Sequence, residues 1–159
     1  MSKIKEILED KNSIIAFDVD GVLAPIEYGE YNHYYANDEE WAEEIEKGTD
    51  FYENVRVVKS IKEYINTKDI NNIYVITKVM NEKEFSDKQK FLNKNYGILK
   101  ENCFYVYDDK EKLNYLDEIR DKTNIDDRLI VMVDDTVSVL NHIMENSKYT
   151  TVHISTFLK

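Results

Sequence analysis

Two pairs of aspartates stand directly after short apolar runs in this sequence. Asp18 and Asp20 follow IIAF, and Asp134 and Asp135 follow LIVMV. Like charges at the end of a buried strand cost electrostatic energy unless a cation or a proton lies between them. If the two runs form neighbouring strands, the four carboxylates converge on one all-oxygen site, which suits Mg²⁺ better than zinc.

A hydroxyl and a cation follow a third apolar run. The stretch NNIYVITK ends in Thr77 and Lys78, and both would lie at the same carboxyl edge of a parallel sheet as the acids. Such groups favour phosphate binding at that edge. Aspartate after a strand is also a common turn former or helix N-cap, so either acidic pair alone fits a structural role equally well.

The elements that must position these residues are short strands that alternate with helices. Runs this short and this rich in Val, Ile and Tyr predict strands buried on both faces, as in parallel sheets. They are residues 14–17, 73–76, 129–133 and 152–154, and a fifth run at 104–107 fits the same description.

Four segments between these runs have apolar residues on one helical face. They are residues 54–65 with Asn54 as N-cap, residues 82–96 ending at Gly97, a segment containing Leu113, Leu116 and Ile119, and a last one containing Leu140, Ile143 and Met144. Alternation of strand and helix predicts an α/β fold, a three-layer Rossmann-like domain with a mainly parallel sheet and right-handed crossovers. Ligands in such sheets bind beyond the carboxyl ends of the strands.

These residues resemble the four motifs of the haloacid dehalogenase (HAD) superfamily of hydrolases. DVDGV matches the first motif, VIT the second, a lysine the third and VDD the fourth, and the resemblance spans roughly residues 14–136. It implies a single HAD-like domain over residues 1–159, with a small cap insert at about 24–53. It also implies a Mg²⁺-dependent phosphomonoesterase that works through a phospho-aspartyl intermediate.

The resemblance assigns roles to the residues of the first and second motifs. Asp18 resembles the nucleophile that attacks phosphorus, and Asp20 resembles the general acid and base. Thr77 would bind the transferring phosphoryl oxygens, and backbone N–H groups from Val19 to Gly21 would supply further donors. Glycine at position 21 would also let the backbone turn.

The metal ligands follow from the same resemblance. Mg²⁺ would be held by the Asp18 carboxylate, the backbone carbonyl of Asp20 and the Asp134 carboxylate. Asp135 would be a further ligand, acting through water or from the outer sphere.

The lysine of the third motif has no fixed spacing. Lys110 and Lys112 both stand at the start of the helix that leads to the last acidic strand. We prefer Lys112, which directly precedes the apolar face of that helix and so points toward the strand ends. Lys88 and Lys90 on the preceding helix are less favoured, and we expect them on a solvated helix face.

The insert is rich in aromatic residues: Tyr28, Tyr31, Tyr34, Tyr35 and Trp41. Their rings could stack a nucleobase, as in the small 5′(3′)-deoxyribonucleotidases of the superfamily, or could pack on the core. Trp41 and Ile45 predict one amphipathic helix. We expect an exposed His33, structural roles for His142 and His153, and a buried, unreactive Cys103.

Composition limits the partners. The chain has 32 acidic and 21 basic residues, which argues against a general nucleic-acid partner. No apolar run is long enough to cross a membrane, and the single cysteine and the N-terminal sequence favour the cytoplasm. We therefore expect a nucleotide or other small phosphorylated metabolite as substrate.

Several alternatives stay open at this point. One is a phosphatase for a polynucleotide 3′ end or a phosphoprotein, which the short insert favours. Another is a noncatalytic domain that binds Mg²⁺ or a partner. A phosphate-accepting signalling domain would lack the second acid at Asp20, and the oligomeric state is left open.

Overall fold

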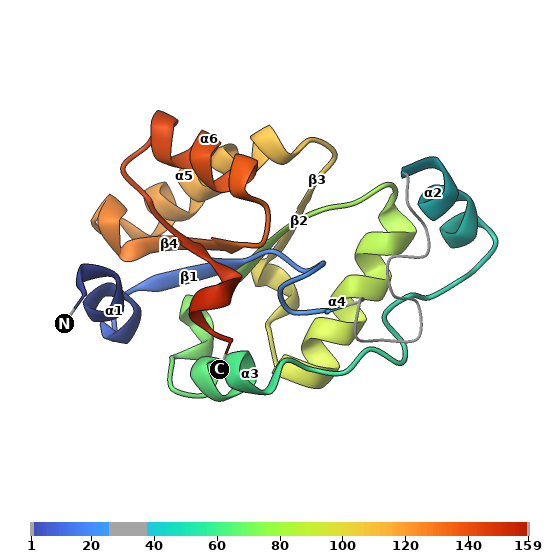
Figure 1. The fold of residues 1–159 in the computed structure, drawn as a ribbon, viewed down its shortest axis with the longest axis horizontal. Coiled ribbons are helices and arrows are strands. Elements are labelled where there is room, and N and C mark those ends of the chain that lie inside the picture. Colours follow the sequence, from blue (N-terminus) through green and yellow to red (C-terminus); the bar gives the residue numbers. More distant parts are fainter. Residues whose placement is uncertain (1, 26–37, 159) are drawn as a thin grey trace.

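The protein is built on one five-stranded sheet in which every neighbouring pair of strands is parallel (Figure 1). The computed structural model describes residues 2–25 and 38–158. The strand order is β3-β2-β1-β4-β5. The strands are β1 (Ile14–Phe17), β2 (Ile73–Lys78), β3 (Cys103–Val106), β4 (Ile130–Asp134) and β5 (Thr150–His153).

Helices cover both faces of the sheet, which gives three layers (Figure 1). One face carries α1 (Lys3–Glu9), α3 (Lys59–Ile65) and α4 (Glu82–Tyr96), and the other carries α5 (Lys112–Thr123) and α6 (Val137–Asn146). Helix α2 (Asp38–Glu46) belongs to the segment between β1 and α3. Short 3-10 helices are η2 (Ile70–Asn72), η3 (Lys100–Asn102), η4 (Asp109–Glu111), η5 (Asp127–Leu129) and η6 (Ile154–Thr156).

Alternating side chains of the central strands fill two separate apolar layers, because successive residues of a strand point to opposite faces. In β1, Ile15 and Phe17 pack with α3 and α4, and Ile14 and Ala16 pack with α5 and α6. Both sets are buried, which explains why the strand reads as a continuous apolar run. The predicted α/β fold with a parallel sheet is therefore confirmed.

Helix α4 begins and ends as its sequence predicts. The Asn81 side chain accepts a hydrogen bond from the backbone N–H of Glu84 at 3.0 Å, and Gly97 closes the helix with φ of 70°. Glycine adopts this left-handed conformation without the steric cost that other residues pay.

Three details differ from the sequence expectation. Helix α3 begins at Lys59 rather than near Asn54, because residues 55–58 are not helical and the extended Val58 donates its N–H to the Tyr96 hydroxyl at 2.9 Å. Met144 lies on α6 but is exposed, since the buried face of that helix is offset from it. Helix α1 was not predicted.

The order in which strands are added to the sheet reverses between β1 and β4. From β1 the chain proceeds outward to β2 and β3, then crosses to the other side of β1 to form β4 and β5. In open parallel sheets in general, ligands bind beyond the carboxyl ends of the strands at the place where the strand order reverses. Within the described residues, no helix is both long and apolar enough to cross a membrane.

Candidate active site

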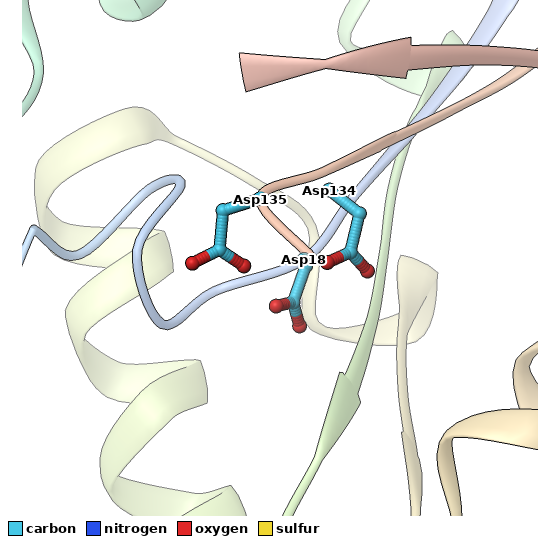
Figure 2. A group of neighbouring side chains, drawn as sticks. All are labelled: Asp18, Asp134 and Asp135. Carbon is cyan, nitrogen blue, oxygen red and sulfur yellow. The ribbon is translucent and has the colours of Figure 1, made fainter. Parts of the chain in front are cut away.

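Three aspartates meet at the ends of β1 and β4 (Figure 2). Asp18 follows β1, Asp134 is the last residue of β4, and Asp135 comes directly after it. Each offers a carboxylate oxygen, and these three oxygens lie within 4.8 Å of one another. The N–H of Asp18 donates to the carbonyl of Val133 at 3.0 Å, so the pairing of the two strands sets the separation of their acids.

Lys112, the first residue of α5, is the cation within this group. Its Nζ lies 2.9 Å from Asp134 Oδ2, 3.3 Å from Asp18 Oδ1 and 3.1 Å from Asp109 Oδ1. The lysine side chain is only 2% exposed. Burial lowers its pKa, but the surrounding carboxylates of Asp18, Asp134 and Asp109 outweigh that effect and the net pKa is raised. Lys112 therefore stays charged.

One lysine does not neutralise these three acids, of which Asp18 and Asp134 are buried and Asp135 is exposed. Burial raises the pKa of Asp18 to about 7, against the opposing effect of Lys112. Burial also raises the pKa of Asp134 and of Asp135, and the charge of Asp18 raises the latter further. Three carboxylates and one ammonium leave two negative charges when all are ionised, so a divalent cation fits this donor set. Oxygen donors alone suit Mg²⁺, Ca²⁺ or Mn²⁺.

Asp20 belongs to a second cluster. Its carboxylate is not part of the three-aspartate group; Oδ1 accepts from the Tyr52 hydroxyl at 2.7 Å and Oδ2 from Lys88 Nζ at 2.8 Å. The Asp20 side chain is 40% exposed, so it reaches solvent while both oxygens are held. The sequence expectation placed only the backbone carbonyl of Asp20 on the metal, and the bonds from Tyr52 and Lys88 to the carboxylate do not involve that carbonyl.

Lys88 corrects the sequence expectation of a solvated helix face. Its side chain is fully buried and projects from α4 to the end of β2, where Nζ donates to Thr77 Oγ1 at 2.9 Å and to the Lys78 carbonyl at 2.6 Å. Burial lowers the pKa of Lys88, but Asp20 and Glu84 outweigh it and the net pKa is raised. Thr77 is itself fully buried beside this cation.

Glu84 is the buried acid that accompanies Lys88, one helical turn earlier on α4. Its Oε1 lies 3.4 Å from Lys88 Nζ and accepts from Trp41 Nε1 at 2.9 Å, and its Oε2 accepts from the N–H of Met80 at 2.6 Å. The Tyr52 hydroxyl also approaches Oε1, at 3.4 Å. Burial raises the pKa of Tyr52 well above its usual range, so this hydroxyl remains a donor.

Gly21 lies in the loop after β1, directly against the side chain of Asp135. It has φ of 75°, and a Cβ at this position would lie 2.2 Å from Asp135 Oδ2. Its N–H donates to the carbonyl of Ala24 at 3.0 Å, so this donor is taken up within the loop and is not available to a phosphate, contrary to the sequence expectation. Val19 is buried, with its carbonyl accepting from Ala24.

Lys110 and Lys78 are the other two side chains that the sequence predicted to contact phosphate. Lys110 is exposed on η4, and its N–H donates to Asp108 Oδ1 at 2.9 Å. Within the described part of the chain, no ion pair joins Lys110 to Asp18, Asp134 or Asp135, whereas Lys112 contacts two of them. Lys78 is half-buried and enters the site through its backbone carbonyl.

The insert packs on the core through Trp41. Its ring stacks on Phe51, with centroids 3.8 Å apart and an interplanar angle of 9°, and its Nε1 is bound to Glu84. Tyr28, Tyr31, Tyr34, Tyr35 and His33 lie outside the described residues.

Cys103 is buried, and burial raises the pKa of its thiol to about 12, as expected of an unreactive cysteine.

Comparison with known proteins adds one structural likeness. The chain is similar to the HAD domain of the effector protein Lem4 from Legionella pneumophila, with a TM-score of 0.44 and 13% identity, over 89% of this chain and 84% of that one. No protein-family model matches the sequence, and no curated protein matches it. A likeness at this level transfers no site residue or substrate.

Sequence reasoning missed three residues of the site, Tyr52, Glu84 and Asp109, and ranked Lys88 below Lys110 and Lys112. A signal for Glu84 and Lys88 exists in α4, because both share the inward face with Phe91 and Leu92. Charged side chains at positions that the apolar period places inside a helix indicate a buried polar network. Tyr52 and Asp109 have no comparable local signal.

Proposed function

We propose that this protein is a divalent-metal-dependent phosphomonoesterase of the HAD type, with Asp18 as the nucleophile. The observation that carries the proposal is the meeting of Asp18, Asp134 and Asp135 with the buried Lys112 at the switch point of the sheet. Such a site combines a carboxylate nucleophile with charges that bind a phosphate and a cation.

In the first step, a carboxylate oxygen of Asp18 attacks phosphorus and the bond from phosphorus to the leaving oxygen breaks. The product on the protein is an acyl phosphate. Asp20, when protonated, gives its proton to the leaving oxygen, so an alcohol departs rather than an alkoxide. The buried Lys112 would stabilise the negative charge that spreads over the phosphoryl oxygens.

In the second step, water hydrolyses the acyl phosphate. Asp20 is now a carboxylate and takes a proton from the attacking water, which regenerates its acid form. The bond between phosphorus and the Asp18 oxygen breaks, and inorganic phosphate leaves. One residue therefore serves both half-reactions, as microscopic reversibility of the proton transfers permits.

The metal would be held by carboxylates of Asp18, Asp134 and Asp135, with the Asp20 carbonyl as a further ligand. When bound, a divalent ion supplies positive charge between nucleophile and phosphate, which the acids alone lack. We propose Mg²⁺ because all the donors are oxygens. The Thr77 hydroxyl and the N–H groups of Val19 and Asp20 would donate to the phosphoryl group.

A small phosphorylated metabolite, including a nucleotide, is the proposed substrate class. The net charge of about −11 opposes a polyanionic substrate. Trp41, Phe51 and Tyr52 are the aromatic residues of the insert within the described part of the chain. Trp41 is stacked on Phe51 and the Tyr52 hydroxyl is bound to Asp20, so none of the three is proposed as a nucleobase platform. Residues 24–53 are proposed as the cap of a single HAD-like domain.

Phosphate release tests the proposal. Purified protein would be assayed on mononucleotides, sugar phosphates, a phosphopeptide and a 3′-phosphorylated oligonucleotide, with Mg²⁺ or with EDTA. We expect release that requires both Mg²⁺ and Asp18, with Asp18→Asn inactive, and a small substrate as the best one. If no substrate of the panel releases phosphate and the protein does not bind Mg²⁺, the catalytic proposal is contradicted. That result would not distinguish small from large substrates.

A further inference from the structure

The carboxylate of Asp20 is held at both oxygens by donors from two different elements. The Tyr52 hydroxyl, from the segment between α2 and α3, donates to Oδ1 at 2.7 Å, and Lys88 Nζ, from α4, donates to Oδ2 at 2.8 Å. Donors on both oxygens fix the rotation of a carboxylate. Each oxygen keeps a second lone pair for a proton.

The three donors of the Lys88 ammonium are directed at three acceptors. They are Asp20 Oδ2, Thr77 Oγ1 at 2.9 Å and the Lys78 carbonyl at 2.6 Å. Because Thr77 Oγ1 accepts from Lys88, its own hydrogen must point to a different acceptor. In the structure that acceptor is the Lys78 carbonyl at 3.3 Å, and a phosphoryl oxygen would be a better one. Lys88 thus links Asp20 to the hydroxyl proposed to bind phosphate.

A gain in the stability of the fold does not explain why Lys88 is buried. A buried ion pair such as Lys88 with Glu84 adds little to stability relative to apolar side chains of the same size. The layer around it is apolar, with Phe91 and Leu92 further along the same face of α4. Glu84 compensates the charge of Lys88, and its bond from Trp41 ties α2 to the same network.

We propose that Lys88 and Tyr52 are positioning residues that orient Asp20 to protonate the leaving oxygen. The inference rests on the proposed phosphomonoesterase function and adds to it two residues that act through Asp20. Without Lys88, Asp20 Oδ2 loses its donor and Thr77 loses the bond that directs its hydroxyl. Without the Tyr52 hydroxyl, Asp20 Oδ1 loses its donor and Glu84 Oε1 loses a contact at 3.4 Å, whereas the bond from Lys88 to Thr77 remains.

Two substrates with different leaving groups can show whether Lys88 and Tyr52 orient Asp20 or only stabilise the fold. An alkyl phosphate needs a proton on its leaving oxygen, whereas dinitrophenyl phosphate releases a stable anion and does not. The measured quantity is kcat/KM, which reports the steps up to departure of the leaving group. We would compare wild type with Lys88→Met, Tyr52→Phe and, as the reference for loss of the acid, Asp20→Asn.

We expect Tyr52→Phe and Lys88→Met to lose roughly 10- to 100-fold in kcat/KM on the alkyl phosphate, and Asp20→Asn at least as much. On dinitrophenyl phosphate, Tyr52→Phe should stay within about 3-fold of wild type, and Lys88→Met should lose less than on the alkyl substrate. Lys90→Met is the matched control, because Lys90 is exposed on the same helix, and it should match wild type on both.

An equal loss on both substrates in Tyr52→Phe, or no loss on either, would overturn the inference. Circular dichroism and thermal melting would check folding, and Tyr52→Phe, which keeps the buried ring, decides the matter if Lys88→Met does not fold. A wild-type protein that shows no Asp18-dependent release from these two substrates or from the panel above, and that binds no Mg²⁺, would overturn the proposed function itself. If the wild type is active but Tyr52→Phe and Lys88→Met lose as much kcat/KM on dinitrophenyl phosphate as on the alkyl phosphate, only this inference is overturned.

Discussion

Asp18 is an acidic side chain placed where its surroundings disfavour its charge. Burial raises its pKa from 3.8 to about 7. Between these two values the folded protein binds a proton that the unfolded chain has already released, so stability falls as pH rises through this window. Above it, the folded state carries the full penalty of the buried charge. A bound cation would relieve that penalty.

Replacement of Asp18 by asparagine should therefore have opposite effects on activity and stability. We expect Asp18→Asn to abolish phosphate release and, at pH 8 in EDTA, to raise the free energy of unfolding by roughly 1–3 kcal/mol. Lys112 keeps Asp134 and Asp109 as partners in the variant. Urea denaturation at pH 8 and pH 4 would measure this gain, which should vanish at pH 4. A variant less stable than wild type at pH 8 would contradict the proposed charge penalty.

Gly21 and Gly97 allow a matched test of the loop that touches Asp135. Both have positive φ, so alanine is strained at either position. At Gly97 nothing lies within 4 Å of the added Cβ, whereas at Gly21 the Cβ would collide with the Asp135 carboxylate. We expect Gly97→Ala to cost about 1 kcal/mol and leave activity intact.

Gly21→Ala should also displace a proposed metal ligand. We expect at least a 10-fold loss of Mg²⁺ affinity and of kcat/KM, of the order seen when support of a metal ligand is lost. Isothermal titration with Mg²⁺ would measure the affinity. Equal Mg²⁺ affinity in the two glycine variants would show that Asp135 does not help to hold the metal.

At the scale of elements, the start of α5 decides which lysine enters the site. Lys110 lies on η4 and Lys112 begins α5. Two residues apart on a helix, side chains point about 200° away from each other, so one lysine faces outward and the other inward. Asp108 and Glu111 form a capping box that holds this turn in place. The cap therefore orients Lys112 indirectly.

Methionine substitutions should separate the two lysines. Lys112→Met leaves Asp18 and Asp134 without their cation, and we expect kcat/KM to fall by about 100-fold or more and stability in EDTA to fall by roughly 2–3 kcal/mol. Lys110→Met should change neither, because that side chain is exposed. Steady-state kinetics and thermal melting would measure both variants. A larger kinetic loss in Lys110→Met would reverse the assignment of the third motif.

Helix α4 serves the fold and the site with different parts of one face. Its second half buries Phe91, Leu92 and Tyr96 against the sheet, and its first half buries Glu84 and Lys88 beside Asp20. The capped start at Asn81 fixes where that charged half meets the end of β2.

At the scale of the whole molecule, sheet topology concentrates negative charge at one place. Strand β1 pairs with both β2 and β4, so Asp18 after β1 and the acids at the end of β4 share an edge with Thr77 near the end of β2. The overall charge of about −11 reinforces attraction of a cation to that edge. Metal binding and folding should therefore be linked.

Stabilisation by Mg²⁺ should depend on pH. A ligand that binds only the folded state at a hundred times its Kd adds about 2.7 kcal/mol to stability. Because burial raises the pKa of Asp18 to about 7, protons compete with the metal below that pH. We expect the rise in melting temperature with excess Mg²⁺ to be large at pH 8 and small at pH 5.

Thermal melting in Mg²⁺ and in EDTA across this pH range would measure the effect. Asp18→Asn serves as the control and should show a smaller shift with weaker dependence on pH. A shift of equal size at pH 5 and pH 8 would indicate that the metal binds elsewhere.

Local patterns predicted much of this protein. Apolar runs of three to five residues located the strands, a cap residue and a glycine located α4, and an acid directly after an apolar run located Asp18 and Asp134. These features depend on neighbours in sequence, since strand and helix periods and caps act over a few residues. Helix α3 was misplaced because Val58 is held extended by the distant Tyr96.

The second cluster of the site depends on packing between distant segments. Tyr52 contacts Asp20 across 32 positions of the chain, and Lys88 reaches it across 68. Whether a lysine on a helix meets solvent or a carboxylate depends on which face the sheet covers, and no local pattern contains that information. The acids and their order along the chain thus follow from sequence alone, whereas the partners of Asp20 follow from the parallel pairing that brings β1, β2 and α4 together.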